Sequence, residues 1–161
     1  MEALLAACGL YCGACYHYRA AEPGGEHLLA EAAQRGRPAA GYTCRGCRSE
    51  TRYIHPGCAQ CTIRACADAH GIAHCGLCAE VPCAMLCAFR DDERVHHRPI
   101  VEQLAALART DPRSWLAVQA ARWTCACGAP FSWYETTCRQ CGAPLDSYGP
   151  DPIIERKDPC S

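Results

Sequence analysis

The spacing of the cysteines between Cys44 and Cys87 constrains this chain more than any other feature of its sequence. Nine cysteines fall in that stretch, and three pairs are separated by two residues, in CRGC, CAQC and CGLC. A pair with this spacing forms a tight turn that directs two sulfurs at one point about 2.3 Å from a zinc ion. Apolar residues are sparse here, so we expect bound metal, and not a large core, to hold this part of the fold together.

The choice between metals and disulfides follows from the cellular compartment. Cysteine makes up 17 of the 161 residues, which is the level of a cysteine-stabilised scaffold. Disulfides belong to secreted chains, but the N-terminal MEALLAACGL has no basic residue and too short an apolar run for a secretory signal. No stretch approaches the ~20 apolar residues of a membrane span. We therefore expect a cytoplasmic protein, without a membrane partner, whose reduced thiols bind metal.

The charge distribution argues against nucleic-acid binding. The formal net charge is -1, Lys157 is the only lysine, and the arginines are scattered. A zinc ion held by four thiolates carries a charge of about -2, so several such sites would make the folded protein acidic. Because nucleic acids are bound through clustered positive charge, we do not expect one as a partner.

Four candidate ligands form a first site with the spacing C-x2-C-x10-C-x2-C, namely Cys44, Cys47, Cys58 and Cys61. Two such pairs close a tetrahedron around one metal ion. His55 lies in the loop between the pairs. We expect it to be solvated, because a lone histidine is more often solvated than a ligand.

Three further cysteines, Cys8, Cys12 and Cys15, form a local C-x3-C-x2-C group near the N-terminus. Three ligands need a fourth from elsewhere, or they leave a coordination position open. Cysteine ligands at this spacing also suit a [4Fe–4S] cluster, which we keep as the alternative cofactor for this group.

The remaining cysteines before residue 90 supply a third site. Local closure predicts one set from Cys66, Cys75, Cys78 and Cys83. This leaves Cys87 as the fourth ligand of the N-terminal group. His70 and His74 flank the set, and either could replace a cysteine. Connectivity among so many cysteines does not follow from sequence, so interleaved pairing remains open. A site in which Cys83 or a histidine replaces Cys87 remains open as well.

The stretch WTCACGAPFSWYETTCRQCGAPL predicts a zinc ribbon whose ligands are Cys125, Cys127, Cys138 and Cys141. Glycine follows the second cysteine of each pair, and FSWY is a strand candidate, so we expect a β-hairpin. Trp133 and Tyr134 could stack on a nucleobase. Without basic neighbours, we expect them to pack within the hairpin. Together with the sites above, the chain would bind about four zinc ions.

Helical patterns mark much of the remaining chain. We expect helices over 26–35, 62–70, 99–109 and 112–122, the last opened by Asp111 as the N-cap. The last helix is expected to bury Trp115, Leu116 and Val118. We expect the adjacent His96 and His97 to lie on the surface, because neighbouring residues do not face one point.

These segments predict a small, metal-stabilised and mostly α-helical fold with irregular cysteine knuckles, followed by a C-terminal β-hairpin zinc ribbon. We expect four parts: a cysteine-rich metal-binding domain (1–90), a two-helix connector (91–122), the ribbon (123–146) and an extended tail (147–161). Cys160, in the tail, is expected to be a free thiol.

The order of the cysteine motifs resembles that of a known family. CGLYCGACYHY, CRGC, CAQCTIRACADAHG and CGLCAEVPCAML follow one another as in a prokaryotic cysteine-rich family, the domain of unknown function 3795. The similarity covers roughly residues 6–89. The following helices and RWTCACG resemble a zinc-ribbon extension that some members carry. Cys87 departs from the usual pattern. The family has no assigned activity, so the resemblance implies a metal-binding domain and little beyond it.

These observations favour a non-enzymatic zinc protein that acts as an adaptor and binds another protein. The sequence has no paired nucleophile and base and no phosphate-binding glycine loop. The alternative is an iron–sulfur protein in electron transfer or in partnership with a redox enzyme, because cysteine ligands suit both kinds of centre. An enzyme with an open metal site or a reactive thiol, Cys8 or Cys87, is a third interpretation.

Overall fold

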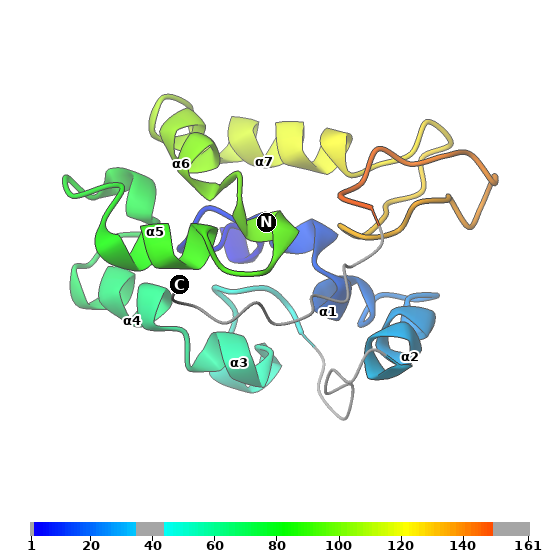
Figure 1. Ribbon diagram of the computed structural model, residues 1–161, viewed down its shortest axis with the longest axis horizontal. Coiled ribbons are helices and arrows are strands. Elements are labelled where there is room, and N and C mark those ends of the chain that lie inside the picture. Colours follow the sequence, from blue (N-terminus) through cyan, green and yellow to red (C-terminus); the bar gives the residue numbers. More distant parts are fainter. Residues whose placement is uncertain (1, 35–43, 150–161) are drawn as a thin grey trace, which may run out of the picture.

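The computed structural model describes residues 2–34 and 44–149, and Figure 1 shows short helices joined by loops. The α-helices are α1 (Tyr16–Arg19), α2 (Glu26–Gln34), α3 (Pro56–Ala59), α4 (Thr62–Ala69), α5 (Ala84–Arg90), α6 (Ile100–Ala108) and α7 (Pro112–Arg122). Single 3-10 turns form η1 (Glu2–Leu4), η2 (Cys12–Ala14), η3 (Thr51–Tyr53), η4 (Cys75–Leu77) and η5 (Val95–His97). Within the described ranges, no helix has the length and apolar character needed to cross a membrane.

The predicted helices are confirmed to within a residue or so at their ends. α7 begins at Pro112 because the Asp111 carboxylate accepts hydrogen bonds from the N–H groups of the second and third helical residues, both at 3.0 Å. α4 ends at Ala69, and Gly71 follows in the left-handed conformation. The predicted last residue of the helix over 26–35 lies outside the described residues, as do Cys160 and the chain from residue 150 on.

The N-terminal segment, residues 3–14, runs through the middle of the molecule, and later segments bind its backbone (Figure 1). Its carbonyl oxygens accept hydrogen bonds from the N–H groups of three distant residues: Arg48 to Ala3 (3.4 Å), Cys75 to Ala7 (2.8 Å) and Trp133 to Ala14 (3.0 Å). A bridge between Leu5 and Tyr11 folds the segment back on itself. Two cysteine loops and the C-terminal module (residues 123–149) therefore meet at this segment.

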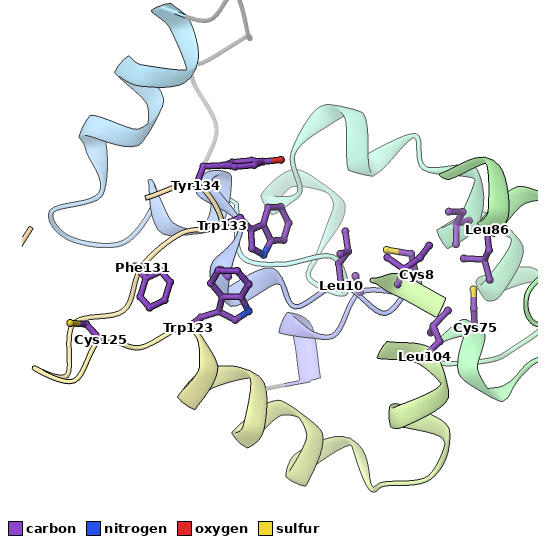
Figure 2. Packing of buried hydrophobic residues seen from close by; sticks show 14 of the residues in the cluster. Cys8, Leu10, Cys75, Leu86, Leu104, Trp123, Cys125, Phe131, Trp133 and Tyr134 are labelled. Carbon is purple, nitrogen blue, oxygen red and sulfur yellow. The ribbon is translucent and has the colours of Figure 1, made fainter. Parts of the chain in front are cut away.

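Apolar packing centres on α6, which contacts η4 and α5. Ile100 and Leu104 of α6 are completely buried, and Leu86 of α5 is nearly so. Figure 2 shows Cys8 and Cys75 in the same cluster, with the aromatic residues of the C-terminal module at its other end. One continuous core therefore joins the first cysteine segment, α6 and the C-terminal module.

The predicted β-hairpin is wrong, because the described residues contain isolated bridges and no strand. In the C-terminal module, Thr124 pairs with Pro130, and Thr137 pairs with Pro144. Each bridge has a proline as one partner, and proline has no N–H group with which to extend a ladder. The strand candidate FSWY bonds to three separate places: Phe131 donates to Trp123 (3.0 Å), Trp133 donates to Ala14 (3.0 Å), and Tyr148 donates to Trp133 (2.8 Å).

His96 and His97 are buried, with about 5 % and 4 % of their surface exposed, so their predicted surface position is wrong. His96 stacks on Trp133, with ring centroids 4.0 Å apart. His97 stacks on Phe89 at 3.6 Å, and its Nδ1 lies 2.8 Å from an Asp92 carboxylate oxygen. The two rings also contact each other edge-on, with centroids 4.3 Å apart, so each has aromatic contacts on more than one side.

Trp133 and Tyr134 are core residues, as the predicted packing role requires, although the packing is not that of a hairpin. The Tyr134 hydroxyl lies 2.5 Å from Nδ1 of His96. Because both aromatic rings are buried against η5, neither is open to a nucleobase.

The predicted burial of Val118 is wrong, since 64 % of this residue is exposed. The predicted burial of Trp115 and Leu116 is confirmed. Successive helical residues are rotated by about 100°, which places Val118 about 110° from the middle of the face that these two residues share.

Gly46 allows the CRGC loop to lie against the N-terminal segment. Its φ is 101°, and a Cβ atom there would collide with the Ala3 carbonyl oxygen. We expect Gly46→Ala to lower the free energy of unfolding by more than the roughly 1–2 kcal/mol that a left-handed conformation costs by itself. Gly71→Ala is the matched control, because its φ is 65° and nothing lies within 4 Å of a Cβ atom. Equal losses for the two variants in urea unfolding would contradict the close contact.

Burial lowers the pKa of His97 below its usual 6.5, although the Asp92 carboxylate opposes this shift. A histidine that stays neutral in the folded protein adds to the stability of the folded state at pH values above 6.5. This stability is lost as the pH falls through 6.5, because the unfolded chain then binds more protons. We expect His97→Phe, which can keep the stacking on Phe89, to lose less stability than the wild type between about pH 7 and pH 5.

The measurement is urea unfolding of both proteins at each pH. Effects of acid on the thiols are common to the two proteins and cancel in the comparison. Parallel pH profiles would show that His97 makes no such contribution.

Candidate metal centre

Four thiols of the C-terminal module converge on one point. The sulfurs of Cys125, Cys127, Cys138 and Cys141 all lie within 4.8 Å of one another. Those of Cys125 and Cys141 are 3.7 Å apart, and those of Cys127 and Cys138 are 3.6 Å apart. Sulfurs at the corners of a tetrahedron, each about 2.3 Å from a central zinc ion, are about 3.8 Å apart. The four cysteines are therefore arranged to hold a metal ion.

Two copies of one turn build this centre, TCACGAP at residues 124–130 and TCRQCGAP at residues 137–144. In each copy the N–H group of the first cysteine donates to the alanine carbonyl, and the glycine N–H donates to the carbonyl of that cysteine, all at 2.8 Å. The threonine of each copy forms the bridge to the proline. This internal repeat predicts paired turns where the strand candidate FSWY predicts a hairpin.

Backbone N–H groups favour an ionised thiol in this centre. Those of Cys141 and Gln140 face the Cys138 sulfur and, together with hydrogen bonds from the thiols of Cys141 and Cys125, lower the pKa of this thiol to about 7. The Ala143 N–H acts in the same way on Cys141, but hydrogen bonds with the neighbouring thiols outweigh it and raise the pKa of Cys141. Thiols this close cannot all ionise unless a cation offsets the repulsion between them, and a metal ion would supply that charge.

One half of the centre is buried and the other half faces solvent. Cys125 and Cys138, the first cysteine of each turn, are buried, whereas Cys127 and Cys141 are exposed. Figure 2 shows Cys125 on the module beyond Phe131, away from the α6 end of the core. A metal ion here would join the two turns to each other, and the buried cysteines would tie it to the core.

The N-terminal cysteines lie beside two of the predicted pairs. Burial raises the pKa of the Cys8 thiol, and among neighbouring thiols those of Cys47 and Cys61 raise it most. The N–H group of Cys47 lies 3.4 Å from the Cys12 sulfur. These contacts bring the N-terminal group to the CRGC and CAQC pairs.

A second group of cysteines surrounds Cys75. Burial raises the pKa of its thiol to about 11, and the thiols of Cys83, Cys66 and Cys78 add to the rise. In the described part of the chain, however, the four sulfurs of the C-terminal module are the group that lies wholly within 4.8 Å. Metal binding by the set around Cys75 therefore stays a prediction, as does any role of Cys87.

The candidate histidine ligands have different surroundings. His55 is half-buried and stacks on the buried His17 with ring centroids 3.8 Å apart, so it is not simply solvated. Nδ1 of His70 lies 2.9 Å from the Cys66 carbonyl oxygen. His74 is buried next to Cys75. His17 belongs to no cysteine pair, and its position two residues after Cys15 is the signal in the sequence that could have marked it.

Comparison with known proteins covers the first half of the chain. The model of a family described as proteins of unknown function, DUF3795, matches residues 4–88. This range contains all predicted ligands up to Cys87 and ends before the C-terminal module. No curated protein and no solved structure matches the chain.

Cys127→Ser tests the metal centre of the C-terminal module. Cys127 is exposed, so its replacement leaves no cavity in the core. We expect the affinity of the module for zinc to fall by more than the 10–100-fold that loss of an outer-shell partner typically costs, because a direct ligand is removed. Competition with a chelator measures this fall, and Thr136→Ala, at an exposed position of the same module, is the control. Unchanged zinc affinity in Cys127→Ser would argue against the centre.

Proposed function

The chain belongs to DUF3795, a family of proteins of unknown function, and we propose that it is a non-enzymatic zinc-binding protein that uses its metal-stabilised surface to bind another protein. The observation that carries the proposal is the set of four thiols at tetrahedral spacing in the C-terminal module. Other cysteines lie around the N-terminal segment and around Cys75, and we propose that they bind metal in the same way.

The compact spacing of the four thiols supports a single metal ion. An iron–sulfur cluster distributes its cysteine ligands over several iron atoms, which spreads the sulfurs more widely than one ion does. Sulfurs 3.6 and 3.7 Å apart match one tetrahedral ion. Zinc is the usual occupant of a tetrahedral four-sulfur site outside iron–sulfur proteins.

A closed set of four protein ligands supports a structural role for this metal. Catalytic zinc sites keep one position for water or substrate, and a centre with four cysteines keeps none. A structural zinc site can contribute on the order of 10–16 kcal/mol to folding, compared with a total stability of roughly 5–15 kcal/mol for a typical domain.

If the metal only stabilises the fold, the protein must act through contacts that its surface makes with other molecules. Large apolar residues are exposed on three elements, namely Leu77 of η4, Met85 of α5 and Val118 of α7. Methionine is among the residue types enriched at protein interfaces, and Leu77 and Val118 are the positions at which the adaptor role is tested below.

The first test is the metal content and visible spectrum of protein purified without oxygen. We expect about four zinc ions per chain, no absorbance near 400 nm, and loss of most far-UV circular dichroism after complete chelation. The physical reason is that metal binding supplies much of the folding free energy. Iron with sulfide and a broad band near 400 nm would instead support the iron–sulfur alternative, and a native-like spectrum after chelation would refute the structural role.

The adaptor role has a separate test. Chemical crosslinking in the native cell should recover one defined partner with the wild-type chain. Val118→Asp or Leu77→Asp should reduce this crosslinking while zinc content stays unchanged. Arg113→Asp is a control, since Arg113 is exposed on the same helix as Val118. If zinc is bound but no protein crosslinks specifically, the adaptor role is wrong and the metal assignment stands.

A further inference from the structure

The N-terminal segment contains a third copy of the turn that builds the C-terminal metal centre. Residues 5–11, LAACGLY, have the same length as TCACGAP at residues 124–130 and share its A-C-G at the same positions. Cys8 therefore stands where the second cysteine of that turn, Cys127, stands. Ala6 stands where the first cysteine, Cys125, stands.

The backbone of the N-terminal copy has the same hydrogen bonds as the two copies in the C-terminal module. The Ala6 N–H group donates to the Leu10 carbonyl at 3.0 Å, and the Gly9 N–H group donates to the Ala6 carbonyl at 2.9 Å. The first and last residues of the copy form a bridge, as they do in both copies of the module. The glycine after the second cysteine is left-handed in all three, with φ values of 85°, 89° and 74° at Gly9, Gly128 and Gly142.

The surroundings of the Cys8 sulfur match those of a second cysteine in the metal centre. There the N–H group of Ala143 faces the sulfur of Cys141, two residues before it. The Leu10 N–H group likewise faces the sulfur of Cys8, and it opposes the rise that burial causes in the pKa of this thiol. A hydrogen bond of this kind favours the thiolate, which is the form of cysteine that binds metal.

Ala6 has no ligand atom, so the N-terminal copy cannot hold a metal ion with a cysteine pair of its own. The copy at residues 137–144 shows where the missing sulfur belongs. There the N–H group of Gln140, the residue directly before the second cysteine, faces the sulfur of the first cysteine. In the N-terminal copy the residue directly before Cys8 is Ala7, and its N–H group faces the sulfur of Cys47. Cys47 therefore takes the place of the missing first cysteine.

Independent contacts hold the CRGC loop against this turn. The Arg48 N–H group donates to the Ala3 carbonyl at 3.4 Å, and Gly46 lies so close to the same carbonyl that a Cβ atom would collide with it. The Cys47 N–H group lies 3.4 Å from the sulfur of Cys12. The loop is thus attached to the segment both before and after the turn, with Cys47 beside it.

Positive groups near Cys47 suit a metal ligand. Burial raises the pKa of this thiol, but the Ala7 N–H group and the guanidinium groups of Arg48 and Arg64 oppose the rise. A zinc ion with four thiolates carries a charge of about -2, and the two arginines would offset part of it.

We infer that Cys8 and Cys47 bind one metal ion as the two halves of a composite turn, in which the CRGC loop supplies the cysteine that the N-terminal copy lacks. Two further ligands complete a tetrahedron, and the Cys12 sulfur lies beside the pair. The composite turn replaces the predicted first site, whose four ligands all come from the CRGC and CAQC pairs. The inference rests on the proposed metal-binding function and concerns residues outside the C-terminal module.

The test is cadmium-113 NMR of the full chain loaded with cadmium alone. Replacing one cysteine by histidine keeps a ligand in place and shifts the resonance of the ion to which it belongs. We expect Cys8→His and Cys47→His to shift the same resonance. The arrangement by local pairs places these two residues on different ions, so shifts of two different resonances would overturn the inference.

A cysteine at position 6 should compensate for the loss of Cys47. Cys47→Ser should remove the resonance that Cys8→His shifts, because the ion loses a ligand. Adding Ala6→Cys to this variant recreates the C-A-C-G of residues 125–128 and should restore a resonance. Adding Ala6→Ser, which has nearly the same size but no thiol, is the matched control and should restore none. Equal spectra for the two double variants would contradict the equivalence of the turns.

Cys127→His separates this inference from the proposed function. It should shift a different resonance, which belongs to the C-terminal module and also shows that the module stays folded in each variant. If that resonance is present and Cys8→His shifts none, the composite turn is wrong while the proposed metal protein stands. If the chain binds no cadmium at all, the proposed function fails as well.

Discussion

The burial of the N-terminal segment is the constraint on which the rest of this structure depends. Residues 3–14 contain only short turns, yet Leu5, Ala7 and Ala14 are almost completely inaccessible to solvent. Buried carbonyl groups need hydrogen-bond donors. The donors come from the CRGC loop, from the start of η4 and from the C-terminal module. The segments that carry the cysteines are therefore also the ones that make the N-terminal segment stable in the core.

The C-terminal module attaches to this core through aromatic residues and not through a sheet. Trp123, Phe131 and Trp133 belong to the same buried cluster as Cys8 and Leu104. His96 of η5 adds a stacked ring and a polar contact with Tyr134. Cys125 lies on the side of the module away from α6, and the other three thiols are within 4.8 Å of it, so a metal ion there would join the two turns.

On the proposed function, metal binding and folding are coupled in this chain. Without metal, burial raises the pKa of Cys8, Cys12 and Cys15, so these thiols are neutral groups in a poorly solvated interior. On the proposed function, a metal ion would convert them into ligands whose negative charge is compensated. The same coupling would then allow a protein with short helices to reach a defined fold.

The spacing and chemistry of the cysteines determined much of this protein from the sequence alone. Turn geometry is local, so the C-x-C and C-x2-C pairs of the C-terminal module predicted its four ligands, and Asp111 predicted the start of α7. The hairpin prediction failed because the strand candidate FSWY and the glycines after the cysteine pairs do not reveal that Pro130 and Pro144 occupy the bridging positions. Only the tertiary structure decided which thiols are neighbours, that His96 and His97 are buried, and that Val118 is exposed. Such contacts join residues far apart in the chain, and their energies depend on packing that no local pattern encodes.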